Sequence, residues 1–243
     1  MSTSEKDVVE KNSAPNKENQ EELDKMIKEG NHFKKLFIIG LIILFILPIV
    51  MFLYNEATST IVKPIIYLYP EEDTNISVVL EKKDNITCSY PKYVNGWNVF
   101  AKTNGDLVDL DTGRNLYSLY YECDKDVEHK MTDEGFVVKG EDSIKFLEEK
   151  LEILGLNERE AEEFIVYWLP ILEKNNYNYI RFASQDEINQ NMPLDVNPAP
   201  DTVIRVLMIT KPLDKYVEVN EQQLEKVERN GYTLVEWGGT IIK

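Results

Sequence analysis

The chain has 243 residues, and its 43 acidic residues outnumber its 27 basic ones. Residues 55–243 hold 35 of the acidic and 20 of the basic residues, so this part alone carries a net charge of −15. Such a surface repels phosphate-rich ligands, which bind through clusters of Lys and Arg. The composition therefore argues against nucleic acid as a partner, and leaves cations, neutral glycans, peptides and basic proteins open.

Residues 1–33 are predicted to form a polar tail. Its first 20 residues are rich in Glu, Lys, Asn and Ser and poor in aromatic residues. A segment of this composition cannot bury enough apolar surface to fold, so we expect it to be disordered. Leu23, Met26 and Ile27 follow at helical spacing, which indicates either a short helix or a solvated lead-in.

Residues 34–54 are predicted to form a single transmembrane helix. There is no charged residue from Phe37 to Leu53, and the apolar run extends over the 19 residues 36–54. At about 1.5 Å per residue it would reach roughly 28 Å, close to the ~30 Å thickness of a hydrocarbon core. Residues 36–54 are therefore the predicted contact with the lipid bilayer. A buried core helix is the alternative, but cores rarely need so long an unbroken apolar run.

The charges that flank this run predict its orientation. Lys34 and Lys35 precede it, whereas Glu56 follows it and the next Lys is Lys63. The positive-inside rule then puts the N-terminus in the cytoplasm and the C-terminal part outside the cell membrane. A cleaved signal peptide is the rival interpretation, but no Ala-x-Ala-like cleavage site follows the run. We expect an uncleaved, single-pass signal-anchor.

The following residues predict an α+β domain over residues 64–243, after a linker at residues 55–63. Its first half has the pattern of short antiparallel strands, with Asn104-Gly105 as a strong hairpin signal. We expect strands at residues 64–70, 76–80, 86–90, 97–101, 107–110 and 116–122.

The second half predicts a helical hairpin followed by a strand–helix–strand end. Apolar residues at helical spacing indicate helices over residues 144–154 and 157–172, the second beginning with a capping box of Asn157 and Glu160. Residues 189–200 have the composition of a polar loop. Gly238-Gly239 predicts a turn into a last short strand at residues 240–242. The other expected elements are strands at residues 177–182, 203–209 and 232–237 and a helix at residues 220–230.

Two cysteines, Cys88 and Cys123, both lie beyond the predicted membrane segment. A bond between them would close a loop of about 36 residues, which stabilises a fold by roughly 3.5–4 kcal/mol in the chain-entropy estimate. An extracytoplasmic location permits such a bond. Free thiols are the alternative.

Sequence motifs for metal, cofactor or nucleophilic chemistry are missing. His129 is the only histidine after the membrane segment and is interpreted as a surface residue. Asp106, Asp109 and Asp111 cluster near a glycine but do not fit the spacing of an EF-hand, so they are interpreted as turn residues, with an irregular cation site as the alternative. No metal and no cofactor is predicted.

Two carboxylates on apolar strands are the strongest candidates for a site. Glu122 follows Tyr121, and Glu236 precedes Trp237, so each carboxylate has an aromatic neighbour. A carboxylate in such a place is paired, faces a cleft or lies at the solvent edge. With Trp97 as a further aromatic platform, these five residues are the predicted binding residues. The alternative is that each carboxylate lies on the solvent face of an edge strand or forms a structural salt bridge with Arg114, Arg181 or Arg205.

Four blocks of this chain resemble those of a family of uncharacterised bacterial proteins that are membrane-anchored or exported. They are Lys63-Pro-Ile-Ile-Tyr-Leu-Tyr-Pro70, the meander from Gly96-Trp97 to Tyr-Tyr-Glu122, Phe164-Ile-Val-Tyr-Trp-Leu-Pro170 and Glu236-Trp-Gly-Gly-Thr240. The resemblance covers about residues 63–242 and implies an extracytoplasmic domain without an assigned activity. The abundance of Lys, Ile and Asn, which have AT-rich codons, also favours a low-GC bacterium.

These features predict a membrane-tethered binding domain of the bacterial cell envelope, with a wall glycan or a protein as its partner. One alternative is an envelope hydrolase that cleaves glycan with the carboxylate pair Glu122 and Glu236. The other is a structural subunit of a membrane complex. Enzymes usually carry a histidine, cysteine or phosphate-loop motif, so the binding domain is the leading hypothesis.

Overall fold

The computed structural model describes residues 60–124 and 129–242, with scattered residues between 21 and 46. The chain forms two compact units, Met1–Ala57 and Thr58–Lys243. In the first unit, every described residue between Glu21 and Ile46 is helical, and the large apolar side chains among them are exposed.

No helix among the described residues is long and apolar enough to cross a membrane. Much of the predicted segment 36–54 lies outside those residues, as do residues 1–20 of the predicted tail. The transmembrane helix and the disordered tail therefore stay predictions.

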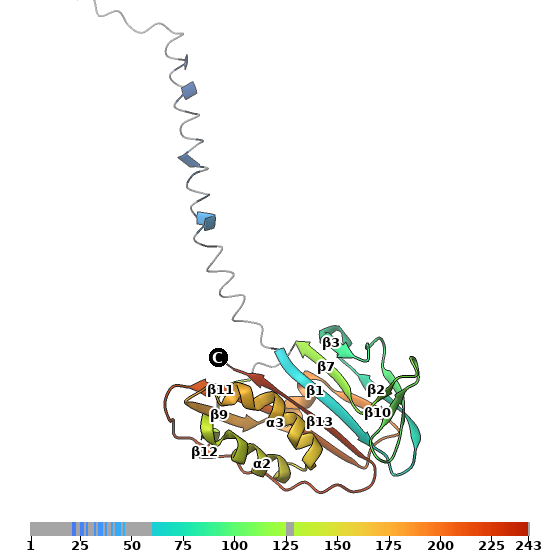
Figure 1. Cartoon of the computed structure of the whole chain (residues 1–243). Helices are drawn as coiled ribbons and strands as arrows, with labels where there is room; N and C mark the ends of the chain where they lie inside the picture. The colour runs from blue at the N-terminus through green and yellow to red at the C-terminus, as the bar shows by residue number, and fades with distance from the viewer. Residues whose placement is uncertain are drawn as a thin grey trace, which may run out of the picture. The chain divides into compact units, whose positions relative to one another are not determined.

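The second unit is an α+β domain of three layers, as Figure 1 shows. The middle layer is a mixed eight-stranded sheet with the strand order β12-β8-β9-β11-β13-β1-β7-β3. A smaller sheet with the order β10-β2-β4-β5-β6 covers one face, and helices α2 and α3 cover part of the other. The strands of the large sheet are β1 (Thr60–Tyr69), β3 (Ile86–Tyr90), β7 (Leu119–Asp124), β8 (Glu134–Lys139), β9 (Tyr177–Phe182), β11 (Thr202–Leu213), β12 (Asn220–Glu221) and β13 (Thr233–Ile241). Those of the small sheet are β2 (Thr74–Leu80), β4 (Trp97–Ala101), β5 (Leu107–Asp109), β6 (Asn115–Leu116) and β10 (Leu194–Asn197).

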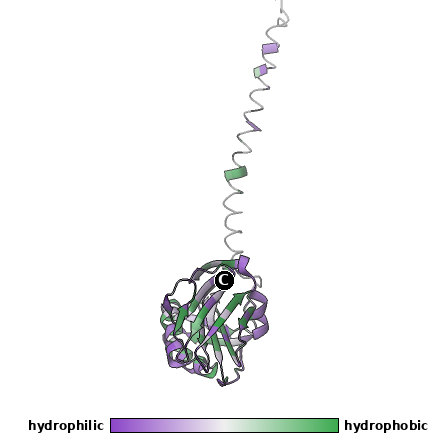
Figure 2. Cartoon of the chain, turned by 90° about the vertical axis from the view of Figure 1, so that its right-hand side faces the viewer, coloured by the Kyte–Doolittle hydropathy of each residue, from purple (hydrophilic) through white to green (hydrophobic). Residues whose placement is uncertain are grey.

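Alternation of side chains along the central strands produces two separate cores. On β1, Ile66 and Leu68 face the small sheet, whereas Ile65 and Tyr67 face the helices. Because successive residues of a strand point to opposite faces, a strand covered on both sides is apolar at most positions. Figure 2 shows hydrophobic stretches, in green, along the strands and hydrophilic ones, in purple, in the outer loops and helices.

The helical hairpin agrees with its prediction. Helix α2 is Ser143–Ile153 and α3 is Glu158–Leu172. Asn157 caps α3 by accepting a hydrogen bond from the Glu160 backbone N–H (2.9 Å), and Glu160 completes the capping box. Trp168 on α3 is fully buried.

The expected strands of the first half are present but belong to two sheets. β1, β3 and β7 join the large sheet, whereas β2, β4, β5 and β6 build the small one. Asn104-Gly105 does connect the antiparallel pair β4 and β5. β1 begins at Thr60, inside the stretch predicted as a linker.

The helix predicted at residues 220–230 is wrong. Only β12 is regular there, and the rest of the segment runs along the domain without helical hydrogen bonds. Tertiary contacts take the place of helical ones. The Gln222 side-chain amide bonds both the N–H and the C=O of Phe182 (2.9 and 2.8 Å), and the Val227 N–H donates to Ile153 O (3.0 Å).

The turn predicted at Gly238-Gly239 is also wrong, because both glycines lie inside the continuous strand β13. A Cβ on Gly239 would overlap the ring of Trp168 and lie 2.8 Å from Met208 O. The glycine is therefore needed for close packing of α3 on the sheet. The elements that were not predicted include β8, β10 and helix α4 (Gln185–Asn191), of which β10 and part of α4 fall in the expected polar loop.

Candidate functional site

Two of the predicted binding residues, Tyr121 and Glu236, meet in a buried cluster with Arg205. Arg205 on β11 lies directly opposite Glu236 on β13, and its Nε donates to Glu236 Oε2 (2.5 Å). The Tyr121 hydroxyl donates to Glu236 Oε1 (2.6 Å). Arg205 and Glu236 are only 5% and 4% exposed. This is the salt-bridge alternative raised by the sequence.

The remaining donors of Arg205 hold helix α4 against the sheet. Its Nη1 donates to Asn189 Oδ1 (2.7 Å), and its Nη2 donates to Met192 O (2.9 Å). Burial by itself lowers the pKa of Arg205, but the charges and hydrogen bonds of Glu236 and Tyr121 together outweigh burial, so the pKa is raised. The enclosed cavity beside the cluster measures about 20 Å³, which is about enough for one water molecule. The cluster therefore has the character of a structural ion pair with little space for a ligand.

Glu122 points to the opposite face of the sheet from Glu236. It precedes Cys123, which belongs to the core beneath the small sheet, and its cross-strand partner is Cys88 on β3. Besides burial, the carboxylate of Glu122 raises the pKa of Tyr120 and of Tyr167, which both lie on the helix side of the sheet. The two carboxylates that the hydrolase alternative requires do not converge on one cleft.

The two predicted tryptophan platforms are buried packing residues. Trp97 is 2% exposed, donates from Nε1 to Pro91 O (2.9 Å) and packs edge-to-face on Tyr93. Trp237 is fully buried on the helix side, with its ring centroid 5.3 Å from that of Phe164. Neither side chain is available to a ligand at the surface.

Both cysteines are free thiols, so the disulfide considered from the sequence is absent. They lie on the neighbouring strands β3 and β7, but Cys88 pairs with Glu122 and Cys123 pairs with Ile86. Cross-strand partners share a face of the sheet, so the two thiols point to opposite faces. Cys88 is exposed and Cys123 is buried in the core.

His129 is 3% exposed, and its interpretation as a surface residue is wrong. Its Nδ1 lies 3.5 Å from Glu187 Oε1, and its Nε2 lies 3.2 Å from Asn191 Nδ2. Glu187 accepts two hydrogen bonds from Arg181 (2.8 and 2.9 Å), which lower the pKa of this carboxyl to about 2. The bonds from Arg181 on β9 to Glu187 hold α4 against the sheet.

The aspartates of the hairpin bind within their own turns. Asp106 accepts a hydrogen bond from Asn104 Nδ2 (2.9 Å), and Asp109 accepts hydrogen bonds from Thr112 Oγ1 (2.5 Å) and from the Asp111 N–H (3.2 Å). Within the described residues, no group of three His, Cys, Asp or Glu side chains is placed to hold a metal ion. These contacts agree with their interpretation as turn residues.

A surface hollow of about 470 Å³ lies on the helix side of the large sheet. Figure 1 shows why it is open: α2 and α3 cover the middle of the sheet, whereas β7 and β3 lie beyond the helices. We call it the tyrosine hollow. Its principal lining residues are Lys63, Tyr90, Asn115, Tyr117, Tyr120 and Glu163.

Strand register places the tyrosines of this hollow in a row. Tyr90 on β3 pairs with Tyr120 on β7, which pairs with Ile65 on β1, so the three side chains cross three strands on one face. Tyr117 comes from the turn between β6 and β7. Tyr90 and Tyr117 are 52% and 44% exposed, so both rings reach the surface at the hollow.

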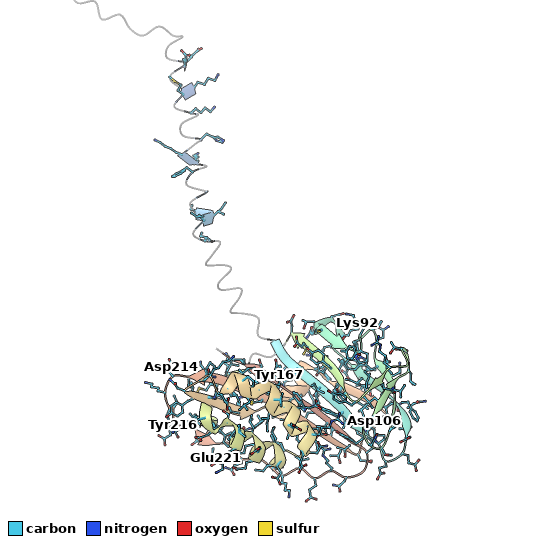
Figure 3. All side chains as sticks on the ribbon, viewed as in Figure 1. Lys92, Asp106, Tyr167, Asp214, Tyr216 and Glu221 are labelled. Carbon is cyan, nitrogen blue, oxygen red and sulfur yellow. The ribbon has the colours of Figure 1, made fainter. Side chains whose placement is uncertain are left out.

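Charged side chains hold the border of the hollow in place. Glu163 on α3 accepts hydrogen bonds from the Tyr67 hydroxyl (2.8 Å) and from Arg159 Nε (3.4 Å). The Arg159 guanidinium lies 4.5 Å from the centre of the Tyr117 ring. Tyr167 on α3 is labelled in Figure 3, and Lys63 Nζ lies 4.5 Å from its ring centre.

Burial and carboxylates raise the pKa of the tyrosines around the hollow. For Tyr67 the causes are burial and then the hydrogen bond to Glu163, and for Tyr120 they are burial and then the hydrogen bond to Glu122. These hydroxyls therefore remain protonated at neutral pH. The hollow offers aromatic faces, hydroxyl donors and carboxylate acceptors.

Of the five residues predicted from the sequence, only Glu122 lies near this hollow. Tyr90 and Tyr117 were missed because their meeting depends on the pairing of β3 with β7 and on the position of α3. The repeated tyrosines in Tyr117-Ser-Leu-Tyr-Tyr121 were the only local signal. Comparison with models of known protein families, with curated proteins and with solved structures gave no match.

Proposed function

We propose that residues 60–242 form a binding domain of the bacterial cell envelope and that the tyrosine hollow binds its ligand. The observation that carries this proposal is the exposure of Tyr90 and Tyr117 around a hollow of about 470 Å³. This volume lies in the ~300–1,000 Å³ range of ligand pockets. Tyrosine suits a binding surface because its hydroxyl is hydrated in the free protein and its ring offers apolar area to a bound ligand.

The ligand class that fits the hollow is a neutral glycan, such as a strand of the cell wall. Sugar rings stack their C–H faces on tyrosine, and their hydroxyl groups bond to side chains such as Asn115 and Glu163, which lie beside the rings. The net charge of −15 on residues 55–243 repels anionic polymers. A neutral polymer avoids that repulsion.

The domain is tethered to the cell membrane by residues 36–54, with the N-terminus in the cytoplasm. Exposed apolar side chains support this part of the proposal: Phe37 and Leu44 are 66% and 65% exposed in the helical residues described there. Water does not favour so much apolar surface, whereas lipid does. Labelling of Cys88 in intact cells with a membrane-impermeant maleimide tests the orientation, and protection of Cys88 until lysis would contradict it.

Binding is tested with the full chain in detergent, in a thermal-shift screen of soluble wall glycan fragments. A ligand that binds only the folded state stabilises it and so raises the unfolding temperature. At a hundredfold excess of ligand over its dissociation constant, the gain in the free energy of unfolding is about 2.7 kcal/mol. Tyr117→Ala should abolish the shift. Tyr216→Ala is the matched control, because Tyr216 is 59% exposed and lies outside the hollow. Equal shifts in both variants would place the ligand elsewhere.

A further inference from the structure

Strand β8 leaves part of its backbone unpaired at the edge of the large sheet. From Phe136 on, its even-numbered residues bond to β9, in register with the Gly140 N–H, which donates to Asn176 O (3.3 Å). Its odd-numbered residues point their N–H and C=O groups outward. Outward carbonyls of Asp133 and Gly135 accept from the N–H groups of Asn220 and Gln222 (2.7 and 3.2 Å).

This pairing with β12 stops after two residues. β12 matches only Glu134 and Gly135 of β8. Gln222 then turns its side chain to Phe182, so the chain leaves the edge. The next outward backbone groups of β8 are the N–H and C=O of Val137 and the N–H of Lys139. No described strand pairs with them. An unpaired edge of this kind is a template for another extended chain.

A large hollow lies beside this free edge. It measures about 760 Å³ and is bounded by the β8 residues Gly135–Lys139, by α2 and by residues 216–221. We call it the edge hollow. Figure 3 shows Tyr216 and Glu221 at the end of the domain away from Lys92 and Asp106, so this hollow is distinct from the tyrosine hollow.

The edge hollow offers an aromatic pair on each face of the sheet. On the helix face, the ring centres of Phe136 and Phe146 are 5.1 Å apart. On the other face, Tyr177 and Tyr216 are 6.0 Å apart. A strand laid along β8 would point successive side chains alternately toward these two pairs. Backbone groups and alternating side-chain contacts are the two components of peptide recognition by strand addition.

The acidity of the whole domain favours a basic occupant. Residues 55–243 carry a net charge of −15, which attracts partners of opposite charge. The lining of the hollow is itself balanced, with Lys139, Lys145 and Lys150 against Asp142, Glu149 and Glu221. Two of these lysines are already paired, Lys139 with Glu141 (3.3 Å) and Lys150 with Glu149 (2.8 Å).

We propose that the edge hollow binds an extended, positively charged peptide segment of a partner protein, which adds as a strand to β8 where β12 ends. The backbone of Val137 supplies the central pair of hydrogen bonds. The peptide's apolar side chains alternate between the phenylalanine and tyrosine pairs. This binding is separate from the glycan binding proposed for the tyrosine hollow, so either can fail without the other.

The test uses a phage-displayed library of random heptapeptides against the full chain in nanodiscs. We expect enrichment of basic peptides with alternating apolar residues, and at least tenfold weaker binding of the selected peptides to Val137→Pro. Proline removes the outward N–H and blocks the edge, but it spares the bonds of β8 to β9. Tyr117→Ala is the control and should bind the peptides like the unaltered chain.

Two further measurements keep the outcome decisive. Tyr216→Ala changes an exposed side chain and should also weaken binding. This variant provides the test if Val137→Pro fails to fold. Hydrogen exchange of the Val137 amide should slow on addition of a selected peptide. The proposal is overturned if no heptapeptide is enriched, or if the selected peptides bind Val137→Pro and Tyr216→Ala as tightly as the unaltered chain.

Discussion

Removal of one partner of the buried Arg205–Glu236 pair should strongly destabilise the domain. Glu236→Leu leaves the Arg205 guanidinium, 5% exposed, without its carboxylate and the Tyr121 hydroxyl without its acceptor. An uncompensated buried charge of this kind costs about 3–5 kcal/mol. Since whole domains are stable by only about 5–15 kcal/mol, this is a large fraction of the total.

Urea unfolding of the full chain, followed by tryptophan fluorescence, measures the effect. With a urea dependence of about 2 kcal/mol per molar, the midpoint should fall by about 1.5–2.5 M. The double variant Arg205→Met with Glu236→Leu should recover at least half of the loss, because it removes both charges. Arg159→Met is the control: its ion pair with Glu163 is within one helix and its side chain is 55% exposed, so about 0.5 kcal/mol or less is expected.

The reasoning is refuted if Glu236→Leu costs no more than Arg159→Met. It is also refuted if the double variant is less stable than Glu236→Leu by itself. Either result would mean that the cluster is open to solvent and not a buried structural pair.

Three further predictions follow from the buried groups. Hydrogen bonds from Arg181 lower the pKa of Glu187 to about 2, below its unfolded value, so their contribution to stability is full above about pH 4.5 and is lost as the pH falls toward 2. Unfolding free energies between pH 5 and pH 2 should therefore fall more steeply in the unaltered chain than in Glu187→Gln. Iodoacetamide should label Cys88 in the native protein and Cys123 only after unfolding, as mass spectrometry can show. Gly239→Ala should cost at least about 2 kcal/mol in urea unfolding, because its Cβ overlaps a buried indole of α3.

Each of these has a contradicting result. Equal pH dependence in Glu187→Gln would mean that the carboxyl is not held by arginine. One label per native chain is expected, so two labels, or none before reduction, would contradict the assignment of the thiols. A fully stable Gly239→Ala would mean that α3 can move away from β13.

Local signals in the sequence were enough to predict the helical hairpin and most strands. Asn157 and Glu160 mark the start of α3 by themselves, and Asn104-Gly105 marks its hairpin. The segment of residues 220–230 carried similar helical signals, but long-range bonds to Phe182 and Ile153 outweighed them. Propensity is a weak guide where tertiary contacts satisfy the backbone.

The candidate site was harder to predict because it depends on which strands are neighbours. Glu122 and Glu236 have similar sequence surroundings, yet the strand pairings direct them to opposite faces of one sheet. Tyr90 and Tyr120 are 30 positions apart and meet only through the pairing of β3 with β7. Both the separation of Glu122 from Glu236 and the contact of Tyr90 with Tyr120 depend on how the early strands are divided between the two sheets. No local sequence pattern encodes that division.

Titration of soluble wall glycan fragments into the full chain by calorimetry tests the central claim most directly. The account predicts saturable binding that weakens at least tenfold in Tyr90→Ala and in Tyr117→Ala and is unchanged in Tyr216→Ala, since only the first two side chains line the tyrosine hollow. Binding that is equal in all three variants, or lost only in Tyr216→Ala, would contradict it.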